Sequence, residues 1–258
     1  MRPVRRGASP ISGNFTDYEK AKPDLVRRIG SGWHHNAQIA SYCSYCERII
    51  ETSLAVEHIQ AKKLEVNGIQ PYAHLIGKWT NFLLACVNCN STKKTKNVVL
   101  SEFLLPDRDN TFIAYEYLQD GTIAIRAPIG HLYDCAEKTL KLVGLDKKPS
   151  VVLDSNDNEI ASDRISQRKN TWVLASHYKN RLDLEPNNQF AKDVIISLAV
   201  SKGFFSIWMK VFENDTDMRN RLIDAFAGTR ESGCFAPITT AIVTPAPNPD
   251  QLANGSKI

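Results

Sequence analysis

Two Cys-x-x-Cys pairs constrain the fold of this chain more than any other feature of its sequence. Cys43 and Cys46 form the first pair, and Cys86 and Cys89 form the second. Tetrahedral zinc accepts four thiolate ligands, and two such pairs deliver them from two separate turns. The pairs lie farther apart than those of a compact zinc ribbon, so an insertion must lie between them. We therefore expect one structural zinc site that joins two distant turns, rather than four unrelated thiols.

The composition is that of an ordinary globular protein. The 258 residues are 43% hydrophobic and 23% charged, which suits one large domain or two small ones. Six cysteines are too few for a disulfide scaffold, and no apolar stretch is long enough to cross a bilayer. The N-terminal residues lack the apolar core of a signal peptide, so we expect a cytoplasmic protein with no membrane partner. A net charge of +4 permits nucleic-acid binding without demonstrating it.

A Glu-His dipeptide and an asparagine accompany the cysteines. Glu57 and His58 lie between the two pairs, and Asn90 directly follows the last cysteine. Hydrolysis of a phosphodiester needs a base that activates water and a cation that stabilises the developing charge. His58 suits the base because its pKa lies near neutrality, while Glu57 and Asn90 offer hard oxygens suited to Mg²⁺ or Mn²⁺. The combination predicts cleavage of phosphodiester bonds, although a buried histidine beside a glutamate is more often structural.

Glu57 and His58 lie in a short strand that we predict over residues 54–59. Neighbouring residues on a regular strand point to opposite faces, so the strand must bend or end at this dipeptide if both are to face one ion. An apolar partner strand is expected over 82–85, after a polar loop over 60–78. A short helix is expected from about Asn90.

The rest of the chain is predicted to be mostly helical. A helix is expected over 16–29, and a second one from about Asn36 into the first cysteine pair. Asp120-Gly121 indicates a hairpin over 111–126. Later helices are expected at about 131–144, 159–182, 188–201, 203–212 and 215–227. We divide the chain into an N-terminal arm and helix (1–35), a core with the cysteines and the hairpin (36–128), a helical region that binds a partner or substrate (129–232) and a mobile tail (233–258).

The motif resembles that of the HNH, or ββα-metal, nuclease superfamily in its zinc-knuckle form. The similarity spans about residues 40–97 and rests on Cys43-x-x-Cys46, Ala55-Val56-Glu57-His58-Ile59, the run from Trp79 to Cys86, and Cys89-Asn90 followed by Lys93 and Lys94. It implies an α+β fold with a zinc-stapled ββα-metal (HNH) core, a β-hairpin and a mostly α-helical C-terminal region. It also implies a structural Zn²⁺ and a catalytic Mg²⁺ or Mn²⁺.

The resemblance assigns a role to each matching residue. His58 takes the place of the general base, Glu57 and Asn90 those of metal ligands, and Asn81 that of the central asparagine, which orders a loop. Two positions depart from the commoner pattern, because Glu57 replaces an aspartate and Asn90 replaces a final histidine. The longer side chain of Glu57 moves the carboxylate, so this departure bears on the metal geometry.

A narrower resemblance is to the PtuB-type HNH proteins of Septu anti-phage systems. The shared features are a basic N-terminus, a Cys-x-Tyr-Cys-Glu opening over 43–47 and a Val-Glu-His strand. This resemblance implies a DNA endonuclease that acts in prokaryotic anti-phage defence beside an ATPase of the ABC or OLD-like kind. Two alternatives are a non-catalytic zinc-knuckle module that binds nucleic acid or an ATPase, and an RNA endonuclease.

Three groups of basic residues are candidates for nucleic-acid contact. Lys93, Lys94 and Lys96 follow the last cysteine pair, and they either bind phosphate or only keep the surface soluble. The other groups are Arg2, Arg5 and Arg6 in the N-terminal arm, and Arg164, Arg168 and Lys169 in the helical region. We interpret the last group as the solvated face of a helix.

Overall fold

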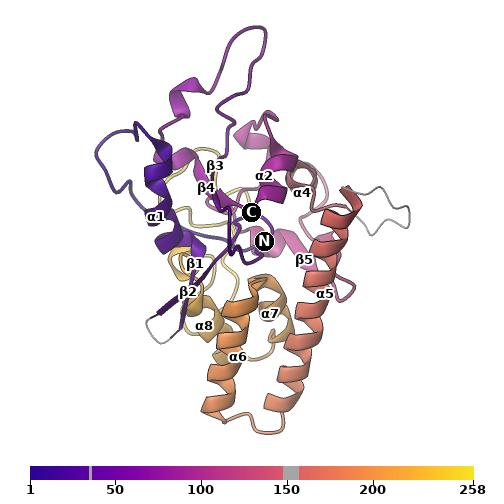
Figure 1. The fold of residues 1–258 in the computed structure, drawn as a ribbon. Coiled ribbons are helices and arrows are strands. Elements are labelled where there is room, and N and C mark those ends of the chain that lie inside the picture. Colours follow the sequence, from indigo (N-terminus) through magenta and orange to yellow (C-terminus); the bar gives the residue numbers. More distant parts are fainter. Residues whose placement is uncertain (35–36, 148–156) are drawn as a thin grey trace.

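In a computed structural model, the chain folds into short β-hairpins surrounded by helices (Figure 1). The structure describes residues 1–258 apart from 35–36 and 148–156. Within these described residues the strands form three separate two-stranded antiparallel sheets. The fold is therefore a mixture of helices and small sheets, in agreement with the expected class.

The two predicted strands around the Glu-His dipeptide pair with each other. β3 (Ala55–His58) runs antiparallel to β4 (Phe82–Ala85), and His58 lies opposite Phe82. All four residues of β4 are buried, as its apolar run predicts. β3 ends at His58 and a bend follows, so the strand ends at the dipeptide, as we expected if both residues are to face one ion.

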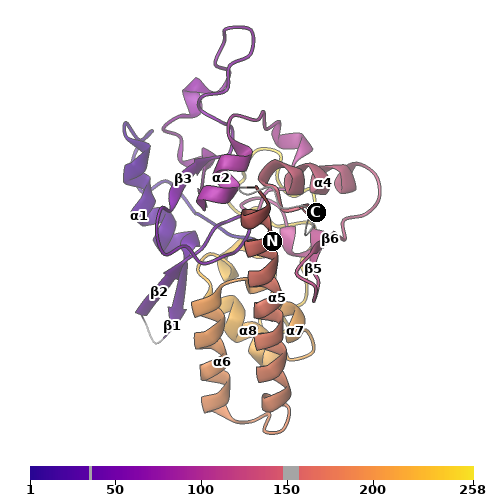
Figure 2. The same ribbon diagram turned by 45° about the vertical axis from the view of Figure 1, so that its right-hand side comes forward.

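α2 (Val87–Lys93) follows β4 directly and packs against both strands (Figure 2). It begins three residues before the expected start at Asn90. The reason is that the Cys86 sulfur caps the first turn by accepting a hydrogen bond from the Cys89 N–H. β4 and α2 thus pack beside the Glu-His dipeptide at the end of β3.

Helices make up most of the C-terminal half. They are α4 (His131–Val143), α5 (Asp157–Leu182), α6 (Gln189–Lys202), α7 (Phe205–Val211) and α8 (Thr216–Ala225). Their bounds lie close to the expected ones because local capping signals are strong: the side chains of Asn188 and Asp215 cap α6 and α8. α5 and α6 form a long helical hairpin that extends away from β3, β4 and α2 (Figure 2).

The N-terminal part contains a helical segment and a hairpin. η1 (Tyr18–Ala21), α1 (Lys22–Leu25) and η2 (Val26–Gly30) cover most of the first predicted helix, although the helix type changes along it. β1 (Ser31–His34) and β2 (Ala37–Ser41) then pair as a hairpin. The prediction of a helix from about Asn36 is wrong. β2 pairs with β1 and packs against α6, and these contacts override the local preference for a helix. Residue 36 itself lies outside the described residues.

The hairpin expected over 111–126 is present in a shorter form. β5 (Tyr115–Tyr117) pairs with β6 (Ile123–Ile125) around Gly121, whose φ of +83° favours glycine. The preceding residues form a helical turn, α3 (Thr111–Ala114). Other short helical turns are η3 (Ala73–Leu75), η4 (Trp79–Asn81), η5 (Leu100–Glu102) and η6 (Arg230–Ser232).

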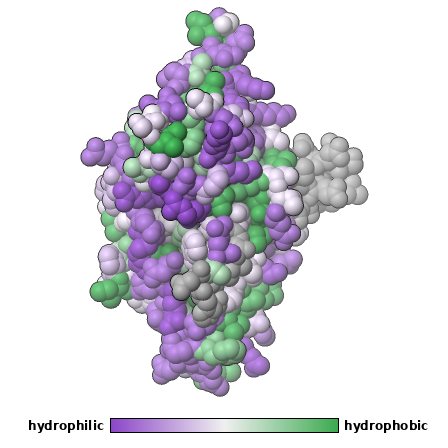
Figure 3. Space-filling view, turned by 60° about the vertical axis from the view of Figure 1, so that its left-hand side comes forward, coloured by the Kyte–Doolittle hydropathy of each residue, from purple (hydrophilic) through white to green (hydrophobic). Residues whose placement is uncertain are grey.

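Two hydrophobic clusters hold these elements together. The first includes buried residues of β3, β4, α2 and α4, such as Leu84 and Leu140. The second lies among α5, α6, α7 and α8, with Trp208 and Phe205 fully buried. The outer face on the α1 side is mostly hydrophilic (Figure 3). The helical hairpin contributes to both clusters, with Trp172 of α5 in the first and Ile195 of α6 in the second.

The C-terminal segment 233–258, expected to be a mobile tail, packs against the body of the protein. Lys257 Nζ lies 3.0 Å from Asp109 Oδ2, and the Asn110 N–H donates to Ile258 O at 3.1 Å. These contacts place the segment against the body of the protein, although it contains no named helix or strand.

Arg2 and Arg6 of the N-terminal arm are buried, so neither is available to nucleic acid. Arg6 Nη2 lies 2.7 Å from Asp107 Oδ2, and Arg6 also donates to Phe82 O. Arg2 Nη2 donates to Ile29 O at 2.6 Å. Both side chains satisfy polar groups inside the fold, which is the usual condition for burying a charge.

Candidate metal centre and adjoining cavity

The four predicted cysteines lie together and are buried. Their sulfur atoms all lie within 4.8 Å of one another, and Cys46 Sγ is 3.7 Å from Cys86 Sγ. Ligands about 2.3 Å from a tetrahedral zinc ion would be about 3.8 Å apart, so the spacing suits zinc and is too long for a disulfide. Burial raises the pKa of the Cys46 thiol, so ionisation of the cluster calls for a cation. The cluster can therefore hold a metal such as zinc and join the turn at Cys43 to the start of α2.

Arg164 of α5 lies against this cluster and is buried. Its Nη1 lies 3.9 Å from Cys89 Sγ and donates to Val143 O at 3.2 Å, while its Nη2 donates to Gly144 O at 2.9 Å. A zinc ion with four thiolates carries two net negative charges, which are costly to bury without a counterion. Arg164 can supply part of that compensation and also caps the end of α4.

The interpretation of Arg164 and Arg168 as a solvated face is therefore wrong. Arg168 is buried too, and its Nε donates to Gly121 O at 2.6 Å, whereas Lys169 is exposed. The sequence carried a signal for this burial: Ile165 and Trp172 are apolar and share the helix face with the two arginines at spacings of three or four residues. The charges of the two arginines, taken alone, favoured exposure to solvent.

A separate cavity of about 330 Å³ lies between η1, β3 and α2. Glu57, His58 and Asn90 all line it, so the structure brings together the residues that the motif assigns to one site. The other lining residues are Tyr18, Glu19, Ala55, Val56, Ala61, Lys62, Lys63, Lys93, Lys94 and Thr95. No cysteine lines this cavity, so the cluster and the cavity are two places connected by α2.

His58 is held at the end of β3 with one ring nitrogen facing the backbone. Its Nε2 lies 2.9 Å from Ile76 O, and because a carbonyl only accepts, Nε2 must carry the proton. A neutral ring then keeps a lone pair on Nδ1. Burial lowers the pKa of His58, so the neutral form prevails at neutral pH. The rings of Tyr18 and Phe82 pack edge-on against it, with centroids 4.7 and 5.2 Å away.

Glu57 is buried and paired with Lys93. Lys93 Nζ lies 2.6 Å from Glu57 Oε1 and donates to His58 O at 2.7 Å. Burial raises the pKa of the Glu57 carboxyl, and Lys93 acts in the opposite direction. Both expectations for Lys93, a phosphate contact or a solubilising charge, are therefore wrong. It lies three residues after Asn90 and so shares the helix face that meets β3.

Asn81 closes the loop that begins after β3. Its Nδ2 donates to Gln60 O at 3.1 Å and to Leu75 O at 3.4 Å, and the Gln60 N–H donates to its Oδ1 at 2.8 Å. The same loop contains Ile76, which positions His58. Asn81 thus holds the loop and does not line the cavity.

Lysines form part of the rim of the cavity. Lys62, Lys63 and Lys94 line it, and Lys62 Nζ lies 3.5 Å from the Tyr18 ring centroid. Lys96 is exposed outside the lining and does not belong to the cavity. Sequence reasoning missed Lys62, Lys63 and Tyr18, although the lysine pair follows the Glu-His dipeptide closely enough to have been noticed.

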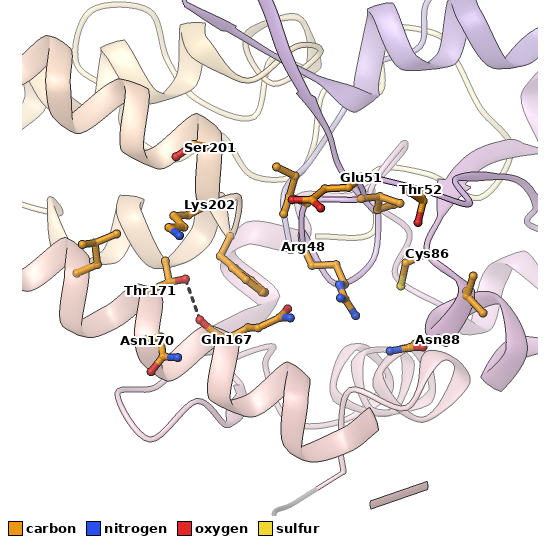
Figure 4. Close-up of a pocket in the computed structure, with 15 residues that line it drawn as sticks. Arg48, Glu51, Thr52, Cys86, Asn88, Gln167, Asn170, Thr171, Ser201 and Lys202 are labelled. Carbon is orange, nitrogen blue, oxygen red and sulfur yellow. Dashed lines mark hydrogen bonds between the residues drawn. The ribbon is translucent and has the colours of Figure 1, made fainter. Parts of the chain in front are cut away.

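A larger cavity of about 560 Å³ lies between the first cysteine turn, the start of α2, α5 and the end of α6 (Figure 4). Arg48, Asn88 and Gln167 extend toward its centre from three different segments (Figure 4). Thr171 Oγ1 donates to Gln167 O at 2.8 Å, and Cys86 forms part of the wall. None of the predicted catalytic residues lines it, so it is not the cavity that the motif predicts.

No protein-family model matches the chain, and a search of curated proteins finds no match. Over the part of the chain that the structure describes, no helix has both the length and the apolar character needed to span a bilayer. The cysteine cluster and the cavity beside α2 are therefore the features from which we infer function.

Proposed function

We propose that the protein is a metal-dependent endonuclease of the HNH kind that hydrolyses phosphodiester bonds in DNA. One observation carries the proposal: Glu57, His58 and Asn90 line a single cavity, and α2 connects it to the four-cysteine cluster. A module that only binds its partner has no need for a buried carboxylate, a neutral imidazole and an amide in one place. The motif that placed these residues together is also the one shared with HNH nucleases.

The two proposed metals have different sites. Zinc belongs to the four cysteines and is structural, because it has no open position there. Mg²⁺ or Mn²⁺ belongs to Glu57 and Asn90, whose oxygens are hard donors. The fit is supported by the shared cavity, because Glu57 and Asn90 both line it and can offer oxygens to one ion, with Lys93 Nζ 2.6 Å from Glu57 Oε1 as a competing partner. When bound, the divalent ion stabilises negative charge on the phosphate and on the leaving oxygen.

The other residues position the reaction. His58 Nδ1 takes a proton from the attacking water, while the bond from Nε2–H to Ile76 O keeps the ring in place. Asn81 fixes the loop that carries Ile76. Burial and the nearby charges of Lys62 and Lys93 lower the pKa of His58, which favours the neutral form of the base.

The lysines at the rim of the cavity suit a polyanionic substrate. Lys62, Lys63 and Lys94 border the cavity and attract phosphate regardless of base sequence. We therefore expect little sequence specificity from the cavity itself.

The function is tested with purified protein, supercoiled plasmid and single-stranded RNA, each with Mg²⁺, Mn²⁺ or EDTA. Nicking or linearisation of the plasmid that needs a divalent ion is the expected result. Cleavage of RNA alone would make the protein an RNA endonuclease. Binding of DNA without cleavage of either substrate would instead establish a non-catalytic module.

The proposal extends to a role in anti-phage defence beside an ATPase of the ABC or OLD-like kind. Support comes from the narrower sequence resemblance and from the helical hairpin, where Val173, Leu184 and Phe190 are exposed apolar side chains. Co-purification with an ATPase encoded beside the protein would test this extension. A monomer that cleaves DNA at full rate and captures no such ATPase would contradict it.

One observation favours the non-catalytic alternative. The ammonium of Lys93 already neutralises Glu57, as a structural ion pair would. If Glu57 serves only that pair, the protein binds nucleic acid or an ATPase and the cavity holds no divalent ion. Measurement of Mn²⁺ binding by the wild type and by Glu57→Gln separates the two possibilities.

A further inference from the structure

Lys93 connects α2 to two consecutive residues of β3. Its side chain is 1% exposed, with Nζ 2.6 Å from Glu57 Oε1 and 2.7 Å from His58 O. Under the proposed function, these two residues are the metal ligand and the base. One buried ammonium therefore touches both parts of the site at once.

Both charges of the Lys93–Glu57 pair are buried. Glu57 is 3% exposed, so neither group is stabilised by water, and each depends on the other. The neighbouring Lys94 is exposed and lies outside this pair. A buried ion pair adds little net stability compared with apolar side chains, so stability alone does not account for this one.

We propose that Lys93 is a positioning residue that fixes the Glu57 carboxylate and at the same time weakens the affinity of the cavity for a divalent cation. The inference rests on the proposed function. A divalent ion at Glu57 shares the carboxylate with the ammonium, and two positive groups at such short range repel each other in a site largely shielded from water. The phosphate of a substrate offsets this repulsion, so the ion and the substrate bind together more tightly than either does alone.

The test compares Mn²⁺ binding with turnover, because the two are expected to change in opposite directions. Mn²⁺ affinity of the zinc-loaded full chain is measured by electron paramagnetic resonance for the wild type, Lys93→Met and the control Lys96→Met, because Lys96 is exposed and does not line the cavity. Lys93→Met should bind Mn²⁺ roughly tenfold more tightly, because a nearby positive charge is gone. Its nicking rate should fall roughly tenfold or more, because the carboxylate is no longer fixed.

The control and the second variants make the outcomes distinct. Lys96→Met should change Mn²⁺ affinity less than about twofold, since solvent screens an exposed charge outside the cavity. If Lys93→Met does not fold, Lys93→Gln retains a donor for His58 O and serves in the same comparison. Mn²⁺ affinity that is unchanged or weaker without the Lys93 charge would overturn the inference. Equal Mn²⁺ binding by the wild type and Glu57→Gln would instead overturn the metal assignment in the proposed function.

Discussion

Replacement of Arg164 by methionine tests how the cysteine cluster is connected to the helical region. Methionine keeps part of the apolar stem but removes the guanidinium that lies 3.9 Å from Cys89 Sγ and donates to Val143 O and Gly144 O. A hydrogen bond from a charged donor contributes about 1.5–3 kcal/mol, and loss of one partner of a buried charged group costs about 3–5 kcal/mol. We expect the free energy of unfolding to fall by about 3–5 kcal/mol, which lowers Tm by roughly 10 °C in a chain of this size.

Urea unfolding followed by circular dichroism measures this loss, and a colorimetric chelator measures how fast zinc is released. Lys169→Met is the matched control, because Lys169 lies on the same helix and is exposed. The control should remain within about 0.5 kcal/mol of the wild type. Arg164→Met should also release zinc faster than the control. If the two variants unfold at the same urea concentration and release zinc equally slowly, Arg164 does not compensate the cluster and the electrostatic reasoning is refuted.

Cleavage should also depend on pH, on Asn81 and on salt. Burial lowers the pKa of His58 below its ordinary 6.5, and only the neutral base is active. Initial nicking rates should therefore be constant above about pH 6.5 and fall only at lower pH, where His58 gains a proton. Asn81→Ala removes the bonds to Gln60 and should lower nicking about tenfold, with zinc content by metal analysis unchanged. Lys62→Gln should reduce the salt slope of DNA binding by about one, as measured by fluorescence anisotropy.

The elements nearest the cysteines could be predicted from sequence because their signals are local. The apolar run over 82–85 and the Glu-His dipeptide were enough to place two paired strands. The spacing of the cysteines was enough to predict one cluster. Asn90 lies in the same cavity as Glu57 and His58 because α2, which begins at Val87, packs against β3.

The buried charges could be predicted only in part, from the apolar residues that share a helix face with Arg164 and Arg168. Lys93, Arg164 and Arg168 lie on helices, where charged residues usually face water. Their partners are distant in sequence, as the pairing of Lys93 with Glu57 shows. The contacts of the C-terminal segment could not be predicted for a related reason. They are with residues near Asp109, and composition carries no information on such pairing.

The central claim is that His58 is the base of a metal-dependent nuclease. The most direct measurement is the initial rate of plasmid nicking in Mn²⁺ by the wild type, His58→Ala and His74→Ala. His74 lies in the loop after β3 and is exposed, so it controls for the loss of an imidazole elsewhere. We predict that His58→Ala loses about 10²–10⁴-fold in rate while His74→Ala stays close to the wild type. Nicking by His58→Ala at the wild-type rate would contradict the account.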